Sequence, residues 1–137
     1  MTKDELMNSE PPVAQLLGRE IVAVDNVHGG ATIRFMARPD FSNRHGTVQG
    51  GLQAAMLDSV TAVALYSVLP AGLTGLTTNL NVSFLRPAKL GAFVATSKVV
   101  TRTDRDAETS GELRDAEGVL VATATAKLRI VAKIVTE

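Results

Sequence analysis

One carboxylate stands out in this chain because its surroundings in sequence are small or apolar. Asp58 lies in Leu52 to Leu69, a run that has no proline or glycine and is rich in alanine, leucine and methionine. On a helix its same-face neighbours are small: Ala54, Ala55, Thr61 and Ala62. An unpaired carboxylate there is costly unless it is hydrated or lies in a cleft, where it can activate water or attack a carbonyl. A partnered structural acid or a solvated helix edge would give the same pattern, so the residue alone leaves both interpretations open.

Two glycines stand directly before this run. Gly50 and Gly51 permit close approach of a ligand or another chain, and the first N–H groups of a helix have no intrahelical acceptor. Those groups and the helix dipole can hold an anion or a developing oxyanion. A simple turn is the alternative interpretation of the same two residues.

The surrounding pattern indicates which elements position these residues. Leu52 to Leu69 is predicted to be a helix of about five turns, ended by Pro70-Ala71-Gly72, and to be buried on most faces because it is apolar nearly all round. Glu20 to Val27 and Ala31 to Met36 are predicted strands joined through His28-Gly29-Gly30. The first dozen residues, which end in Pro11-Pro12, are predicted to be a loose lead-in or to lead into a short helix over Val13 to Leu17; the two interpretations stay open. Ala37 to Gly51 is predicted to be a long loop.

Further strands are predicted after the helix. In Leu76 to Leu85, alternation predicts Leu76, Leu80, Val82 and Phe84 on one face, with Thr77, Asn79, Asn81 and Ser83 on the other. The later strands are predicted at Ala92 to Thr103, Glu108 to Arg114 and Val119 to Ile134, the last two joined by a turn at 115–118. Alanines share one face of the last strand and leave room for a bulky element. We therefore expect an α+β fold in which one curved antiparallel sheet of five to six strands wraps around one long central helix, as a single domain over residues 1–137.

Composition excludes several classes of function. The 14 basic and 14 acidic residues balance, so the basic surface typical of nucleic-acid binding is not expected. The chain has no cysteine, which excludes disulfides, a thiolate nucleophile and cysteine-ligated metals, and with two histidines a histidine-rich metal site is not expected. No signal peptide and no membrane-spanning run is recognised, so a cytoplasmic protein is expected. Aliphatic residues dominate a core with few aromatics, which favours burial of further surface in an oligomer.

The segment before and into the helix carries a resemblance. Asn43…Gly46-Thr-Val-Gln-Gly-Gly-Leu…Leu-Asp58, followed by Leu85-Arg-Pro-Ala-Lys-Leu-Gly91, resembles the hotdog-fold acyl-CoA thioesterases of the phenylacetic-acid-degradation (PaaI-like) group. The resemblance covers about Pro39 to Ile130. It implies the same sheet wrapped around one helix, and an oligomer of at least two subunits, commonly a tetramer, with each site shared between two subunits.

The resemblance also implies roles for individual residues. Asp58 matches the catalytic carboxylate, and the N–H of Gly50 matches the group that polarises the thioester carbonyl. Asn43 matches a loop amide that positions substrate or carboxylate, and Thr77 matches a hydroxyl that orients the attacking water. Gln49 stands where relatives usually have histidine; it can donate a hydrogen bond but cannot carry a proton.

Substrate contacts are implied more weakly. Gly51 accompanies Gly50 at the helix start, and Arg102 and Arg105 match a basic stretch that contacts the coenzyme A nucleotide; an ordinary solvated pair is the alternative. The implied activity is hydrolysis of medium-chain or aryl(acetyl)-CoA thioesters without a cofactor, since coenzyme A is part of the substrate. Two alternatives remain: a non-catalytic acyl-CoA-binding module, and a hotdog hydratase or dehydratase, which would need a histidine that His45 does not supply at a matching position. The acyl group, the nucleophile or base role of Asp58, and the mode of dimer pairing stay open.

Overall fold

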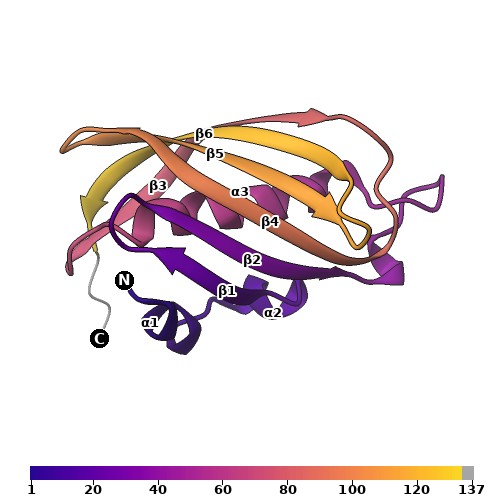
Figure 1. Cartoon of the computed structure of the whole chain (residues 1–137), viewed down its shortest axis with the longest axis horizontal. Helices are drawn as coiled ribbons and strands as arrows, with labels where there is room; N and C mark the ends of the chain where they lie inside the picture. The colour runs from indigo at the N-terminus through magenta and orange to yellow at the C-terminus, as the bar shows by residue number, and fades with distance from the viewer. Residues whose placement is uncertain (134–137) are drawn as a thin grey trace.

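The computed structural model describes residues 1–133, in which one antiparallel sheet of six strands curves around a single long helix, α3 (Figure 1). The elements are α1 (Lys3–Asn8), α2 (Pro12–Leu16), β1 (Glu20–Asp25), β2 (Gly30–Ala37), the short 3-10 helix η1 (Pro39–Phe41), α3 (Gly50–Tyr66), β3 (Leu73–Phe84), β4 (Gly91–Arg102), β5 (Asp106–Asp115) and β6 (Leu120–Ala132). The predicted α+β class, strand number and central helix are confirmed.

The order of strands across the sheet is β1-β2-β4-β5-β6-β3, and every neighbouring pair is antiparallel. The chain leaves β2, passes through α3 and returns as β3 at the far edge of the sheet. Helix α3 contacts all six strands, so it lies in the hollow of the curved sheet and forms the centre of the core. The two edge strands are β1 and β3.

Helix α3 begins two residues earlier than predicted and ends three residues earlier. Gln49 is its N-cap residue, with an extended backbone, and the two glycines form its first turn. Ser67 ends the helix because its hydroxyl donates to the carbonyl of Ala64 at 2.7 Å, which satisfies a carbonyl of the last turn. Burial on most faces is confirmed, since Met56, Leu57, Val60, Val63 and Leu65 of the helix are buried and Leu52 is partly buried.

The predicted alanine face of the last strand packs against this helix. Ala122, Ala124 and Ala126 are buried, and they alternate with exposed or half-buried threonines. On the adjacent strand β5, a Cβ added at Gly111 would lie only 3.0 Å from Cγ2 of Thr61. Small residues on β5 and β6 thus let the helix lie close to the sheet, as the alternation indicated.

The predicted faces of β3 are confirmed for residues 79–84 but were wrong for Leu76 and Thr77, because the strand contains a β-bulge at Thr78. Thr77 pairs with Leu128 and Asn79 with Lys127, so one residue is extra and the alternation changes phase. Thr77 therefore lies on the inner face, as does Leu80, which pairs with the buried Ala126. Leu76 does not share a face with Leu80; its side chain is on the outer face and 55% exposed.

Other boundaries differ in detail. Helix α1 was not predicted; it lies beside β1 and buries Leu6, a residue in an otherwise polar stretch (Figure 1). Helix α2 begins one residue before the predicted Val13, since proline is favourable at a helix start. The predicted loop 37–51 contains η1 and the first turn of α3, and Ile134, the predicted end of the last strand, lies outside the described residues. Within residues 1–133, no helix has the length and apolar character needed to cross a membrane.

Candidate active site

Asp58 lies on the side of α3 that the sheet leaves partly open. Its side chain is half-buried, and the hydroxyl of Thr77 donates to its Oδ1 at 2.9 Å. The alanines on the same side, Ala54, Ala55 and Ala62, are also only half-covered. The structure thus brings two of the predicted site residues into direct contact, beside a surface of small side chains.

Helix α3 and strand β3 run in opposite directions along each other. Gly50 lies near the ring of Phe84, Asp58 accepts from Thr77, and the hydroxyl of Tyr66 donates to the carbonyl of Gly75 at 3.0 Å. A Cβ at Gly50 would lie 3.3 Å from the Phe84 ring. The free side of the helix is therefore bordered along its whole length by one edge strand.

The start of the helix offers two free donors. Among the hydrogen bonds of residues 1–133, none is donated by the N–H of Gly50 or Gly51, whereas the N–H groups of Leu52 and Gln53 both reach the carbonyl of Gln49. A Cβ at Gly51 would have no neighbour within 4 Å, so the first turn faces open space. The arrangement can accept an oxyanion or another acceptor. The side chain of Gln49 is exposed and makes no cap hydrogen bond, while its N–H donates to the carbonyl of Phe41 at 2.9 Å.

Gly50 and Asp58 do not meet within one chain. They are eight residues apart on a continuous helix, which corresponds to about 12 Å along the axis. A single thioester carbonyl cannot touch both groups of the same helix, because each contact requires hydrogen-bond distance.

Asn43 organises the loop before the helix. Its Oδ1 accepts from the N–H groups of His45 and Thr47 at 2.9 and 3.2 Å, and its Nδ2 lies 3.0 Å from the Thr47 hydroxyl. These bonds form a compact turn at 43–47, in which Gly46 has a φ of 78°. Within this chain Asn43 makes no hydrogen bond to Asp58 among the described residues.

The two arginines lie at the opposite end of the helix from Gly50. Nη1 of Arg102 donates to the carbonyl of Val68 at 3.1 Å, and Arg105 is exposed in the β4–β5 turn. Arg102 also borders an open cavity of about 420 Å³ near Leu69 and Leu73. The structure therefore separates the arginines from both Asp58 and Gly50.

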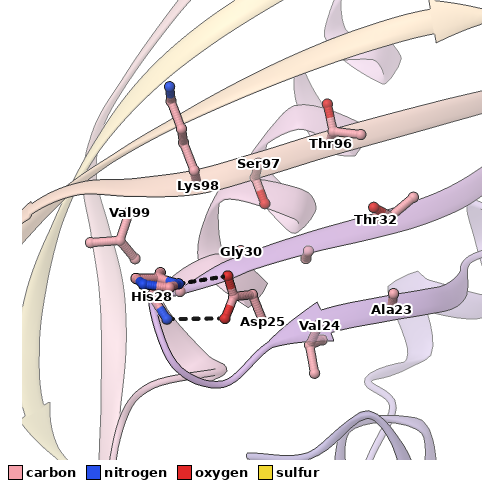
Figure 2. A pocket seen from close by; sticks show the side chains of 12 residues that line it. Ala23, Val24, Asp25, His28, Gly30, Thr32, Thr96, Ser97, Lys98 and Val99 are labelled. Carbon is pink, nitrogen blue, oxygen red and sulfur yellow. Dashed lines mark hydrogen bonds and ion pairs between the residues drawn. The ribbon is translucent and has the colours of Figure 1, made fainter.

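A larger hollow of about 520 Å³ lies elsewhere, over β1, β2 and β4 beside the β1–β2 turn (Figure 2). At its rim, Nδ1 of His28 lies 3.3 Å from Oδ2 of Asp25, both side chains being exposed, and Lys98 lines the hollow from β4. Hydrogen bonds from the backbone N–H groups of His28 and Val27 hold the pKa of the Asp25 carboxyl below its ordinary value. None of the sequence-predicted site residues lines this hollow. Across residues 1–133, no group of three His, Cys, Asp or Glu side chains is arranged to hold a metal ion.

One buried arginine near this part of α3 was not predicted from the sequence. Nη1 of Arg19 donates to the hydroxyl of Ser59 at 3.1 Å, next to Asp58 on α3. Arg19 precedes β1, and no local motif distinguishes it from a surface arginine. Only the packing of the N-terminal segment against α3 shows that it is buried.

Comparison with known proteins places these features in a family. The family model described as thioesterase superfamily matches residues 45–122. Human acyl-coenzyme A thioesterase 13 is 31% identical over 110 residues, which cover 79% of this chain and 77% of that protein.

Solved structures agree with this result. The crystal structure of a phenylacetic acid degradation-related protein from Ralstonia eutropha JMP134 is 39% identical, with a TM-score of 0.86 over 93% of this chain and 98% of that one. The PaaI protein of E. coli, from the phenylacetic acid degradation operon, is 23% identical and shares the fold, with a TM-score of 0.85 over 98% and 94% of the two chains. The family match includes the first turn of α3, Asp58 and Thr77. This chain belongs to the thioesterase superfamily and has its hotdog fold.

Proposed function

We propose that this protein hydrolyses acyl-CoA thioesters to the free acid and coenzyme A, with Asp58 as the general base or nucleophile. The observation that carries the proposal is the half-buried Asp58 carboxylate, oriented by the Thr77 hydroxyl on a helix face of small residues. The thioesterase family match and the similarity to acyl-coenzyme A thioesterase 13 support this substrate class.

The chemistry requires two groups at one carbonyl. A backbone N–H such as that of Gly50 stabilises the negative charge that develops on the thioester oxygen. Asp58 removes a proton from a water held near Thr77, or it attacks the carbonyl and forms a mixed anhydride that water then hydrolyses. Either route ends with a carboxylate and the thiol of coenzyme A. Gln49 can donate a hydrogen bond to the substrate, but its amide cannot supply the proton.

The separation of about 12 Å between Gly50 and Asp58 supports a site shared by two copies, in which one subunit provides the helix start and the loop with Asn43. The edge strand β3 supports the same arrangement, because one of its two backbone hydrogen-bonding edges has no partner strand among the described residues. The strand also carries the exposed side chains of Leu76 and Phe84. We propose a homodimer that pairs along this edge, and a tetramer of two such dimers. Sedimentation of the purified chain tests this; a monomer with full activity would contradict the shared site.

Substrate contacts are proposed outside the reacting atoms. Gly51 allows the thioester to approach the helix start, since nothing in the chain occupies the space beside it. Arg102 and Arg105 lie exposed at the other end of α3, where they are free to meet phosphates of a long ligand. A medium-chain or aryl(acetyl) acyl group is proposed, with no cofactor apart from coenzyme A within the substrate.

A non-catalytic acyl-CoA-binding module is the main alternative. It would bind acyl-CoA tightly and release no thiol. The filled carboxylate and hydroxyl positions favour catalysis, because a binding module needs no oriented carboxylate. A hydratase or dehydratase would change the enoyl absorbance of its substrate without releasing thiol. His45 is exposed in the 43–47 turn, and within residues 1–133 its backbone N–H is hydrogen-bonded whereas its ring is not.

A thiol-release screen across an acyl-CoA panel tests the proposal. Asp58→Asn keeps the shape of the side chain and its contact with Thr77 but removes the carboxylate, so we expect thiol release to fall by about a thousandfold or more. The exposed Asp104→Asn serves as a control for the loss of one carboxylate. Full turnover by a folded Asp58→Asn variant would refute the role of Asp58.

We also propose that residues 1–137 act as one domain in the cytoplasm. The larger of two hydrophobic clusters joins α1, the sheet and α3, and Tyr66 and Leu80 pack against both clusters, which supports the first point. Cell fractionation tests the second.

A further inference from the structure

A cavity of about 230 Å³ lies between the N-terminal segment, the second half of α3 and the start of β3. The residues that line it include the apolar Leu6, Val63 and Leu73 and the polar Thr74 and Tyr66. Arg19 borders the same cavity. A charged group in the wall of an apolar pocket needs an explanation, because burial of a charge is costly.

The guanidinium of Arg19 is short of acceptors. Its side chain is 8% exposed, and of its five N–H donors one is hydrogen-bonded among the described residues, from Nη1 to the hydroxyl of Ser59. Nε is buried without a hydrogen bond, and its nearest carboxylate oxygen, on Glu10, is 3.6 Å away. An added oxygen acceptor would therefore find donors that the protein leaves unused.

The charges around the cavity favour an anionic group over a neutral one. Two cationic side chains, Arg19 and Lys133, line it, whereas none of the described residues that line it is acidic. Glu10 lies 3.6 Å from Nε of Arg19 without lining the cavity. Glu10 keeps 27% of its side chain exposed, which leaves part of its charge in contact with solvent. A carboxylate can accept two N–H bonds from one guanidinium, and a hydroxyl accepts fewer.

Helix α3 and strand β3 both extend from the Asp58–Thr77 pair to this cavity. Val63 and Tyr66 are five and eight residues after Asp58, so they lie about 8 and 12 Å further along the helix axis. On β3, Thr74 precedes Thr77 by three residues, or about 10 Å. Arg19 lies at the end of the cavity nearer to the carboxylate, because its Nη1 donates to Ser59, the residue after Asp58.

We propose that this cavity binds the distal end of the acyl group, and that Arg19 makes the enzyme prefer acyl groups that end in a carboxylate. The inference rests on the proposed thioesterase function and names its substrate class: CoA monothioesters of dicarboxylic acids of medium length. Arg19 acts on specificity and takes no part in bond breaking. A purely structural Arg19, which only ties Glu10 and the N-terminal segment to α3, is the competing explanation.

Three CoA thioesters of equal chain length separate these explanations: hexanoyl-CoA, ω-hydroxyhexanoyl-CoA and adipoyl-CoA. For the parent protein we expect kcat/KM for adipoyl-CoA to exceed that for hexanoyl-CoA by about tenfold or more, with the hydroxy compound between them. Arg19→Met should remove most of this preference, Arg19→Lys should keep part of it, and Glu10→Gln should increase it. Arg34→Met, which removes an exposed arginine paired with Glu20, should leave the ratio unchanged.

Equal kcat/KM values for the three thioesters in the parent protein would overturn the inference, as would an Arg19→Met variant that retains the preference. If Arg19→Met does not fold, Arg19→Lys and Glu10→Gln decide the question through the same ratio. A parent protein that releases no thiol from any thioester would refute the proposed function instead. In that case the two thioesters stay intact, and calorimetric binding of adipoyl-CoA and hexanoyl-CoA tests the cavity directly. Tighter binding of adipoyl-CoA that is lost in Arg19→Met would support the proposed anion site, and equal affinities would reject it.

Discussion

The hydrogen bond from Thr77 to Asp58 allows the proposed catalytic role of the carboxylate to be tested without altering the carboxylate itself. Thr77→Val keeps the shape and the branched Cβ of the side chain but removes the hydroxyl that lies 2.9 Å from Oδ1 of Asp58. Valine suits a strand at least as well as threonine, so the backbone of β3 should be unaffected.

The magnitude follows from the charge on the acceptor. A hydrogen bond to a charged group contributes about 1.5 to 3 kcal/mol, and each 1.36 kcal/mol of transition-state stabilisation corresponds to about tenfold in rate. If the bond holds Asp58 in its reactive orientation, kcat should fall by about 10- to 150-fold. KM should change little, since the hydroxyl orients the carboxylate or the attacking water and does not anchor the substrate.

The assay is steady-state thiol release with the best substrate of the acyl-CoA panel, combined with a urea unfolding curve. Thr78→Val is the matched control, because it removes an exposed threonine hydroxyl one residue away that donates to the carbonyl of Lys127 at 3.1 Å. Thr77→Ser should retain most of the activity, as the hydroxyl is preserved. Equal loss in the Thr77→Val and Thr78→Val variants, or no loss in Thr77→Val, would refute the assignment.

Three further outcomes are expected. Gly50→Ala places a methyl group 3.3 Å from the Phe84 ring, beside the free N–H groups of the first helical turn, so thiol release should fall at least about tenfold. A second substitution in the same chain, Phe84→Leu, should restore part of the activity. Unchanged turnover in Gly50→Ala would contradict a role for this turn. Gly75→Ala brings a Cβ within 2.6 Å of Cδ2 of the fully buried Leu65, so the free energy of unfolding in urea should fall by about 1 to 3 kcal/mol. An unchanged urea midpoint of unfolding would contradict this, because it would mean that Leu65 can move aside without cost. Because folding lowers the pKa of Asp25, its carboxylate stabilises the folded state at pH values above 3.8, the ordinary pKa of the group. This contribution is lost as the pH falls through the lower pKa of the folded state. Asp25→Ala should therefore lower the melting temperature at neutral pH and flatten its decline in acid, and parallel melting curves in acid would contradict this.

The fold could be predicted from sequence because its main signals are local and repeated. The alternation in the last strand and the uninterrupted apolar run of α3 each extend over many residues, so single exceptions do not obscure them. Helix α1 was missed because one buried side chain, Leu6, gives no periodic signal. The inner face of β3 was assigned wrongly because a bulge changes the phase without a mark in the sequence: Thr78 is one threonine among three polar residues at 77–79.

The site could be predicted only in part. Asp58 and the two glycines are recognisable by their setting in an apolar helix, and Thr77 was placed in the site by resemblance, although simple alternation put it on the wrong face. The bulge turns the Thr77 hydroxyl towards the helix, which explains why Thr77 contacts Asp58 and why simple alternation placed it on the opposite face. Arg19 could not be predicted, because its burial arises from contacts with α3 that are formed 40 residues away in the chain.

The bulge at Thr78 also constrains how the length of β3 can change over evolutionary time. Loss of Thr78 itself would remove the extra residue and leave Thr77 opposite Leu128 and Leu80 opposite Ala126, so both faces of the strand would be retained. Insertion of one residue elsewhere in the strand, or deletion of one with the bulge retained, would exchange the inner and outer faces beyond that point. Thr77 or Leu80 would then face away from α3, so such a change would disrupt either the site or the core beneath it. Substitutions carry no such penalty, because they alter one side chain and leave the phase intact. Changes of length in β3 among descendants of this chain should therefore be confined to the bulge, while other insertions and deletions should collect in turns such as 70–72 and 115–118.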